Sequence, residues 1–282
     1  MIRAGGPRRI GSGRSLVNLN GTIGPRMISW AQRWRRQAMA WADNGLELLF
    51  PPRCRWCRAE QDPAPGGLCA ACARDFADAG GRCPRCGVAG QASTDAGCPA
   101  CRRGHPAWDG IVVLGAYADE LREAILRVKR PGHEDLARSL AMLLVDRHRD
   151  ALHSMHVDAV VPVPMHWWRR ACRGTSAAEE IARAVACALE SRAVSALVRF
   201  RATRMQNELP AEERADNVHG AFRLRTAVAG RRILVVDDVV TTGSTLAACC
   251  RTLRAAGAAG VAVAALAKAD RWGHESERGT HS

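Results

Sequence analysis

The sequence contains no long apolar run and no apolar segment near its start. The longest uncharged apolar stretch, residues 255–267, spans 13 residues, whereas a membrane-spanning helix needs about 18 or more. Residues 1–26 contain several Arg and Gly but no apolar core of a signal sequence. With 47% hydrophobic and 24% charged residues, the composition is that of a globular protein. These features predict a cytoplasmic protein with no stable membrane span, and they exclude a collagen-like or wholly disordered chain.

Lysine is also rare, because Lys129 and Lys268 are the only two in the chain and every other basic residue is Arg. Lys and Arg together number 41 against 28 Asp and Glu, which gives a formal net charge of +13. An excess of positive charge favours contact with phosphates, either in a small ligand or in a nucleic acid. Charge alone does not distinguish these two partners.

Two common phosphate-binding motifs are absent, since no Gly-Lys-Ser/Thr closes a Walker A loop and no GxGxxG occurs. Residues 233–245 (ILVVDDVVTTGST) instead place an apolar strand before Asp237 and Asp238, followed by a turn rich in hydroxyl groups and then a helix. Open α/β sheets bind ligands at the carboxyl ends of their strands. The N–H and hydroxyl groups of this turn can surround a phosphate at the positive end of the helix. The predicted phosphate-binding residues are Thr241, Thr242, Gly243, Ser244 and Thr245.

Cysteine is abundant, with 12 in the chain, and eight of these form four Cys-x2-Cys pairs. The pattern Cys-x2-Cys-x11-Cys-x2-Cys occurs twice, with the second copy 29 residues after the first. Such pairs suit tetrahedral thiolate coordination, and the lack of an export signal argues against disulfides. We therefore predict two structural zinc sites. Pairing in sequence order closes the shorter loops, while a cross-braced pairing of the first pair with the third remains open. The predicted ligands are Cys54, Cys57, Cys69, Cys72, Cys83, Cys86, Cys98 and Cys101. Cys187, Cys249 and Cys250 lie in apolar helical patterns and are predicted to be buried.

The chain divides into segments of different character. Residues 1–26 are predicted to be a disordered basic tail, 27–49 an amphipathic helix, 50–106 the zinc module, 107–270 an α/β domain and 271–282 a polar, disordered tail. The Trp-bearing helix either lies on a membrane surface or packs on the zinc module, and we favour packing. Met1 and Met27 are both candidate starts.

Expected strands and helices alternate between residues 107 and 270. The strands are expected at 111–117, 158–164, 194–200, 233–236 and 261–266, and the helices at 119–129, after a capping box formed by Ser176 and Glu179, and at 245–256. This alternation predicts an α/β fold with a mainly parallel sheet and helices on both faces.

The stretch 233–245 resembles the signature of the type I phosphoribosyltransferases. The resemblance implies that Asp237 and Asp238 act at the ribose hydroxyls of 5-phosphoribosyl 1-pyrophosphate, that the turn 241–245 holds its 5′-phosphate, and that Mg²⁺ accompanies the pyrophosphate. Candidate cations for the leaving group are Lys129, Arg130, Arg204 and Arg214, of which we favour Lys129 and Arg214; His166 is either a ligand contact or a loop residue.

The order of segments resembles the ComF family. The cysteine module follows Leu-Phe-Pro-Pro-Arg (49–53), and further matching segments are 126–129, 161–166 and 206–222. The resemblance implies a type I phosphoribosyltransferase-like domain that transfers phosphoribosyl to a nitrogen acceptor in connection with DNA uptake during natural transformation. The alternative is a non-catalytic competence component that binds single-stranded DNA or a helicase partner. Where the family usually continues Phe-Asn-Gln after Arg173-Gly174, residues 175–177 are Thr-Ser-Ala, a segment expected to shape the mouth of the active site.

Overall fold

A computed structural model describes residues 53–60, 66–78, 80–90, 98–165, 176–200 and 221–269, all within one compact unit, Pro52–Ser282. In chain order, its elements are α2 (Ala70–Asp75), α3 (Pro99–Arg103), β1 (Ile111–Ala116), α4 (Asp119–Val128), α5 (Glu134–Arg147), α6 (Arg149–Ser154), β2 (Ala159–Pro162), α8 (Ala177–Ala188), β3 (Arg192–Ala193), β4 (Leu197–Arg199), β5 (Phe222–Leu224), β6 (Arg232–Val240), α10 (Ser244–Ala255) and β7 (Gly260–Lys268). Among these described residues, no helix has the length and apolar character needed to cross a membrane.

Five strands form a parallel sheet in the order β1-β7-β6-β2-β3. The two longest strands, β6 and β7, pair at its centre from Arg232 opposite Gly260 to Val240 opposite Lys268. A separate two-stranded antiparallel sheet joins β4 and β5. The predicted mainly parallel α/β sheet is therefore confirmed.

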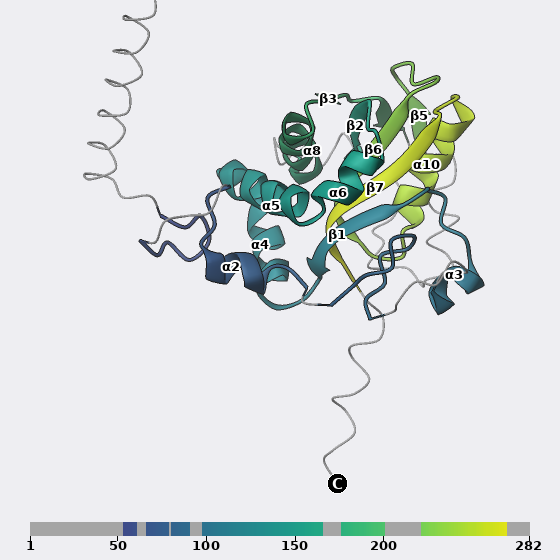
Figure 1. The fold of residues 1–282 in the computed structure, drawn as a ribbon. Coiled ribbons are helices and arrows are strands. Elements are labelled where there is room, and N and C mark those ends of the chain that lie inside the picture. Colours follow the sequence, from purple (N-terminus) through teal and green to yellow (C-terminus); the bar gives the residue numbers. More distant parts are fainter. Residues whose placement is uncertain are drawn as a thin grey trace, which may run out of the picture. The chain divides into compact units, whose positions relative to one another are not determined.

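Helices cover both faces of the sheet, with α4, α5 and α8 on one face and α10 on the other (Figure 1). Side chains of each strand alternate between the faces. In β6, Leu234 and Val236 join the core that contains α5 and α8, whereas Ile233 and Val235 join the core that contains α10. Burial of both faces explains why these strands read as continuous apolar runs.

Two predicted strands differ from the structure, and two helices were not predicted. The expected strand at 194–200 is shorter in the structure, because only β4, Leu197–Arg199, lies within that range. β3 comes just before it, and a tight turn in which the Ala196 N–H donates to the Val194 carbonyl at 2.8 Å leads from β3 to β4. The expected strand at 233–236 continues to Val240, since β7 is long enough to pair with all of it. The helices α5 and α6 were not predicted, although Leu136, Leu140 and Leu144 share a spacing of four and are buried.

Two further expectations need correction. Ser176 takes the N-cap position of α8, but its side chain makes no capping hydrogen bond, so the capping box does not form. Cys249 and Cys250 are buried as predicted, whereas Cys187 is exposed because its position on α8 faces away from the sheet. The predicted tails 1–26 and 271–282 and the predicted helix 27–49 lie outside the described residues.

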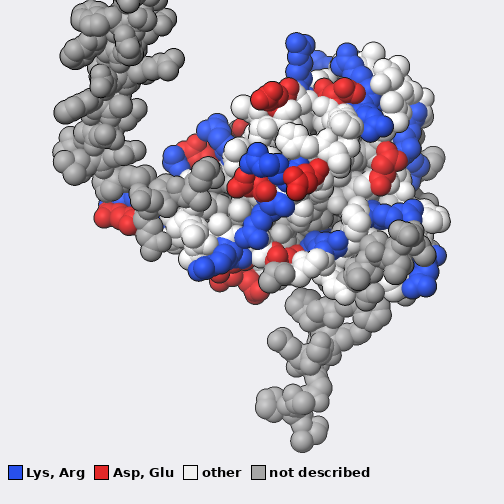
Figure 2. Space-filling model, viewed as in Figure 1, with Lys and Arg blue, Asp and Glu red and all other residues white. Residues whose placement is uncertain are grey.

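Basic and acidic side chains are interspersed on the face shown in Figure 2. Some basic and acidic side chains form ion pairs within helices, such as Arg127 with Glu123 at 2.6 Å and Arg138 with Asp135 at 3.4 Å. Exposed pairs of this kind contribute about 0.3–0.5 kcal/mol each. Among the described residues, the basic side chains on this face therefore do not form one separate basic track.

Candidate functional site

The two adjacent carboxylates lie where β6 extends beyond its neighbour β2. The β2 partner of β6 ends at Pro162, which lies opposite Val236, whereas β7 continues alongside β6 to Val240. One edge of β6 is thus free of β2 from Asp237 onward. The side chains supply hydrogen bonds here: Asp237 Oδ1 accepts the Asp238 N–H at 2.9 Å, and Asp238 Oδ1 accepts the Val239 N–H at 2.8 Å.

The turn after β6 leads directly into the first turn of α10. Gly243 is the N-cap of α10 and has a φ of 77°, a left-handed conformation that favours glycine. The Thr242 and Ser244 hydroxyl oxygens lie 2.9 Å apart, and the Ser244 N–H donates to Thr242 Oγ1 at 3.4 Å. No acidic residue lies in the first turn of α10. The positive end of the helix is therefore free of acidic side chains from its own first turn, as a site for a phosphate requires.

Lys129 is brought to the acids from a distant part of the chain. It is the C-cap residue of α4, and its Nζ lies 2.9 Å from Asp238 Oδ2, with 30% of the Lys129 side chain and 18% of the Asp238 side chain exposed. Burial lowers the pKa of Lys129, but the charge and hydrogen bond of Asp238 outweigh burial and raise the pKa above its usual value. Lys129 is therefore a charged group within the site.

The surroundings of Asp237 disfavour the ionised form of its carboxyl group. Burial and the neighbouring charge of Asp238 raise its pKa well above the usual value, and the N–H of Asp238 and the charge of Lys129 only partly oppose this. Two adjacent carboxylates with one ammonium group leave one charge uncompensated. Donors from a ligand, such as sugar hydroxyls, would relieve this charge.

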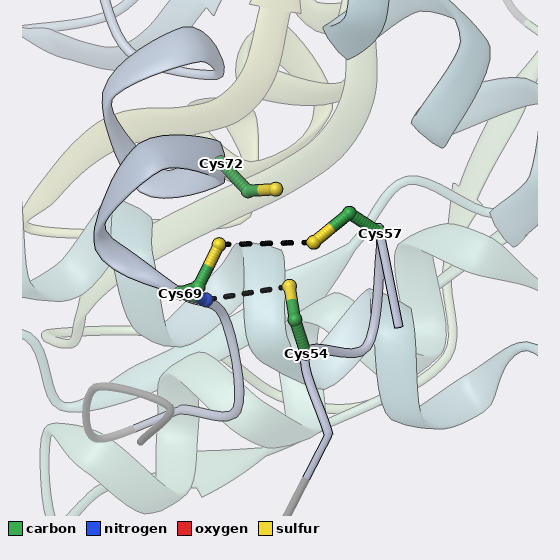
Figure 3. Close-up of side chains that lie close together, drawn as sticks. All are labelled: Cys54, Cys57, Cys69 and Cys72. Carbon is green, nitrogen blue, oxygen red and sulfur yellow. Dashed lines mark hydrogen bonds between the residues drawn. The ribbon is translucent and has the colours of Figure 1, made fainter. Parts of the chain in front are cut away.

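The eight cysteines of the repeat form two separate groups of four in sequence order. In each group the four sulfur atoms lie within 4.8 Å of one another. Cys57 Sγ and Cys69 Sγ are 3.8 Å apart (Figure 3), as are Cys83 Sγ and Cys101 Sγ. Four thiolates bound tetrahedrally to zinc at about 2.3 Å lie about 3.8 Å from one another. The predicted structural zinc sites are thus supported, and the cross-braced pairing is wrong. We refer to Cys54, Cys57, Cys69 and Cys72 as the first cluster and to Cys83, Cys86, Cys98 and Cys101 as the second cluster.

Backbone N–H groups favour a thiolate at the first cysteine of each cluster. Burial raises the pKa of Cys54, but hydrogen bonds from the N–H groups of Cys69, Cys57 and Trp56 lower it to about 6. The Cys69 N–H, for example, lies 3.3 Å from Cys54 Sγ (Figure 3). The N–H groups of Cys86 and Arg85 overcome burial in the same way and lower the pKa of Cys83 to about 6. Both clusters therefore fit zinc in geometry and in chemistry.

The second cluster is connected to the turn at Gly243 through Trp108, a residue that the sequence did not single out. The Trp108 Nε1–H donates to the Arg85 carbonyl at 2.9 Å, and Arg85 lies between Cys83 and Cys86. A Cβ on Gly243 would lie 3.0 Å from Trp108 Cη2. No sequence motif indicates this contact, because it joins three segments that are distant in the chain.

Several predicted site residues cannot be placed. His166, Arg204 and Arg214 lie outside the described residues. Thr175, the first residue at which the sequence departs from the family pattern, also lies outside them. Arg130 is described and exposed, immediately after Lys129. Of the predicted leaving-group cations, Lys129 is thus the one that the described structure brings to the acids.

The parallel sheet, the two acids near the end of β6 and the helix α10 with Gly243 at its N-cap are together typical of the phosphoribosyltransferase class. A phosphoribosyl transferase domain model matches residues 133–278, and a double zinc ribbon domain model matches residues 45–105. The chain is 33% identical over 231 residues to the DNA utilization protein YhgH of Escherichia coli K12 and 33% identical over 230 residues to Competence protein F of Haemophilus influenzae. Each alignment covers 78% of this chain and 99% of the relative. The chain belongs to the ComF family of phosphoribosyltransferase-domain proteins with a double zinc ribbon.

Proposed function

We propose that this protein binds 5-phosphoribosyl 1-pyrophosphate at the end of β6 and transfers its phosphoribosyl group to a nitrogen acceptor. The observation that carries the proposal is the juxtaposition of Asp237 and Asp238 with the glycine turn that begins α10. Carboxylates accept hydrogen bonds from ribose hydroxyls, while N–H and O–H groups of the turn donate to the 5′-phosphate. The predicted roles of Asp237, Asp238 and the turn 241–245 thus agree with the chemistry of each group.

In the proposed reaction, a nitrogen lone pair forms a bond to ribose C1 as the bond from C1 to the pyrophosphate oxygen breaks. The pyrophosphate leaves with the bonding electrons, so negative charge grows on it while the ribose gains oxocarbenium character. Cations near the leaving group stabilise this charge. Ribose competes with Lys129 for Asp238, so we expect binding to release the Lys129 ammonium group for the leaving group. Arg214 remains a further candidate.

Mg²⁺ is expected to arrive with the pyrophosphate. Within the described residues, the groups suited to hold a metal are the two cysteine clusters, and Asp238 is already paired with Lys129. A site of this kind suits Mg²⁺ bound mainly by substrate oxygens, with the protein supplying at most one or two carboxylates. The ion would neutralise part of the pyrophosphate charge.

Isothermal titration with the magnesium complex of phosphoribosyl pyrophosphate tests the proposal. The wild-type chain is expected to bind, and the double variant Asp237→Asn/Asp238→Asn is expected to bind at least about 100-fold more weakly, because two charged hydrogen-bond acceptors are lost. Asp146→Asn is the matched control, since Asp146 is an exposed carboxylate on α5. Release of pyrophosphate that depends on an added nitrogen acceptor would establish transfer. No binding by the wild-type chain would overturn the proposal.

The names of the relatives favour a connection with DNA, and this supports a second candidate function. We infer a cytoplasmic role in DNA uptake or utilization, either through phosphoribosyl transfer or as a non-catalytic component that binds single-stranded DNA or a helicase. Reduced thiolate clusters suit the reducing conditions of the cytoplasm. If DNA binds through phosphate contacts, its affinity must fall steeply between 50 and 200 mM salt. A flat response to salt would contradict the DNA-binding candidate.

A further inference from the structure

The segment that carries Trp108 lies between the second cluster and β1 in the chain, and hydrogen bonds on both sides of Trp108 fix its position. The Asp109 N–H donates to the Val261 carbonyl at 2.8 Å, and Asp109 Oδ2 accepts the Val261 N–H at 2.8 Å. Arg254, in the last turn of α10, donates to the Ala107 carbonyl at 3.1 Å and to Asp109 Oδ1 at 2.5 Å. The backbone on both sides of Trp108 is therefore fixed to β7 and α10.

The indole of Trp108 makes two contacts that join different functional parts. Its Nε1–H donates to the carbonyl of Arg85, inside the Cys83–Cys86 pair of the second cluster. Its six-membered ring lies against Gly243, where an added Cβ would be 3.0 Å from Cη2 and 3.7 Å from Cζ3. One rigid side chain with two torsion angles therefore connects the second cluster to the turn that begins α10.

The backbone around the second cluster gives this connection a defined position. The Pro84 carbonyl accepts the Ile111 N–H at 2.8 Å, so the Cys83–Cys86 pair is attached to the start of β1. A Cβ on Gly87 would lie 3.1 Å from Val113 Cγ2 and 3.3 Å from Lys268 Cδ. The pair is therefore packed directly on β1 and β7, and a metal that fixes the four thiolates also fixes the carbonyl that orients Trp108.

The contacts of the first cluster lead elsewhere. Trp56, which occupies the position in the Cys54–Cys57 pair that Arg85 occupies in the second, packs edge-on against Phe76 with ring centroids 5.4 Å apart. The Arg127 guanidinium of α4 lies over the Trp56 ring at 4.2 Å. These contacts are made with α2 and α4, so Trp56 provides a matched indole in the other cluster.

We propose that Trp108 is a positioning residue that holds the phosphate-binding turn in shape from the second cluster, so that the second cluster, and not the first, supports ligand affinity. This inference rests on the proposed function. Trp108 need not contact the ligand. It restricts Gly243, and through Gly243 it restricts the N–H groups that would face the 5′-phosphate.

The test compares ligand affinity in the full-length wild-type chain, Trp108→Phe, Trp108→Ala and Trp56→Phe, each with its zinc content measured. Trp108→Phe keeps a ring but loses the donor to Arg85, and we expect it to bind the magnesium complex of phosphoribosyl pyrophosphate about 3- to 10-fold more weakly. Trp108→Ala should lose about 10-fold or more, because the ring beside Gly243 is also lost. Trp56→Phe should stay within about twofold of wild type.

Fluorine NMR of the chain labelled with 5-fluorotryptophan gives a second readout that does not depend on activity. The resonance missing from Trp108→Phe is expected to move when ligand is added, and to move without ligand in Cys101→Ser. The resonance missing from Trp56→Phe should stay in place on ligand addition. If wild type binds ligand but Trp108→Phe binds equally well and the Trp108 resonance does not move, the inference is wrong and the proposed function stands. If wild type does not bind, the proposed function fails and the inference fails with it.

Discussion

The two cysteine clusters have identical spacing, but their surroundings are different. Cys54, Cys69 and Cys72 of the first cluster belong to the large core that contains α4, α5 and α8. Cys83, Cys98 and Cys101 of the second cluster form a small core of their own. The first is therefore part of the packing that stabilises the domain, whereas the second is attached by backbone contacts and by Trp108. A repeat in sequence does not imply a repeated role.

The contact between the first cluster and the sheet is unusually close. The Asp78 N–H donates to the Leu114 carbonyl, and Asp78 Oδ1 accepts the Ala116 N–H at 3.0 Å. A Cβ on Gly115 would lie 2.5 Å from the Phe76 carbonyl oxygen, so only glycine allows the chain after α2 to approach β1. The side of the molecule with the first cluster is built for stability. The end of β6 and the Gly243 turn instead contain costly features, namely a carboxyl group with a raised pKa and a left-handed residue, which the proposed ligand site would use.

The largest expected difference follows from removing one ligand of each cluster. Cys72→Ser should lower the midpoint of thermal unfolding by about 10 °C or more, because metal binding by four thiolates supplies much of the folding free energy of such modules and this cluster shares the main core. Cys101→Ser should lose one zinc per chain as well, but with less than half the decrease in the midpoint. Calorimetry with zinc analysis measures both, and Cys187→Ser is the control, since Cys187 is an exposed thiol outside the clusters. Equal decreases would show that the two clusters contribute alike.

Asp237, unlike the cluster cysteines, should have a destabilising role. The raised pKa of Asp237 means that the native state holds this proton at pH values where the unfolded chain has lost it. The native state then binds more protons, so the free energy of unfolding falls as pH rises above the usual carboxyl value. Asp237→Asn should therefore be more stable than wild type at neutral pH and show a weaker decrease between about pH 4 and 7, although it should bind ligand poorly.

Asp238→Asn provides the contrast within the same pair, because it removes the partner of the half-buried Lys129. We expect it to lower the free energy of unfolding by about 1–3 kcal/mol, the usual cost of leaving a buried polar group without its partner. Urea unfolding at several pH values measures both variants. A loss of stability in Asp237→Asn would contradict the view that this carboxyl is costly in the absence of ligand.

Two glycines at opposite ends of α10 separate backbone strain from the contact with Trp108. Gly243 and Gly257 both have positive φ, at 77° and 84°. Alanine at either position should cost about 1–2 kcal/mol of stability. At Gly243 the new Cβ would also meet Trp108 Cη2 at 3.0 Å, whereas at Gly257 it would meet Ala229 at an ordinary 3.5 Å. Gly243→Ala should therefore also weaken ligand binding about 10-fold or more, and Gly257→Ala should not. Thermal unfolding and isothermal titration together distinguish the two effects.

Much of the fold could be predicted because its strands are apolar runs between helical patterns. The end of β6 could not, since Asp237 and Asp238 read as the end of a strand, while in the structure pairing with β7 keeps them within it. The division between β3 and β4 also depended on a tight turn at Val194–Ala196 that no glycine or proline marks.

The candidate site was predictable to the extent that its chemistry is local in sequence. The acids and the turn are contiguous in 233–245, and Lys129 came from a matched segment of the family. The ion pair of Lys129 with Asp238 depends on the packing of α4 beside the sheet. Trp108 was missed because its contacts with the Arg85 carbonyl and with Gly243 join residues that are distant in the sequence.

The smallest expected effect concerns the residue that follows the second cysteine of the first cluster, and the equivalent residue of the second cluster provides the comparison. Arg58 and Gly87 occupy equivalent positions and have similar left-handed φ angles of 65° and 75°. Arg58→Gly should relieve backbone strain of about 1 kcal/mol, but the greater freedom of glycine in the unfolded chain offsets most of it, leaving a gain of at most about 0.5 kcal/mol. Gly87→Ala should lose about 1–2 kcal/mol, because it adds the same strain and places a Cβ 3.1 Å from Val113 Cγ2. Urea unfolding in excess zinc measures both. Gly87 packs on β1 next to the segment that holds Trp108, so Gly87→Ala should also weaken ligand binding. A gain of ligand affinity in either variant would contradict the division of roles between the clusters.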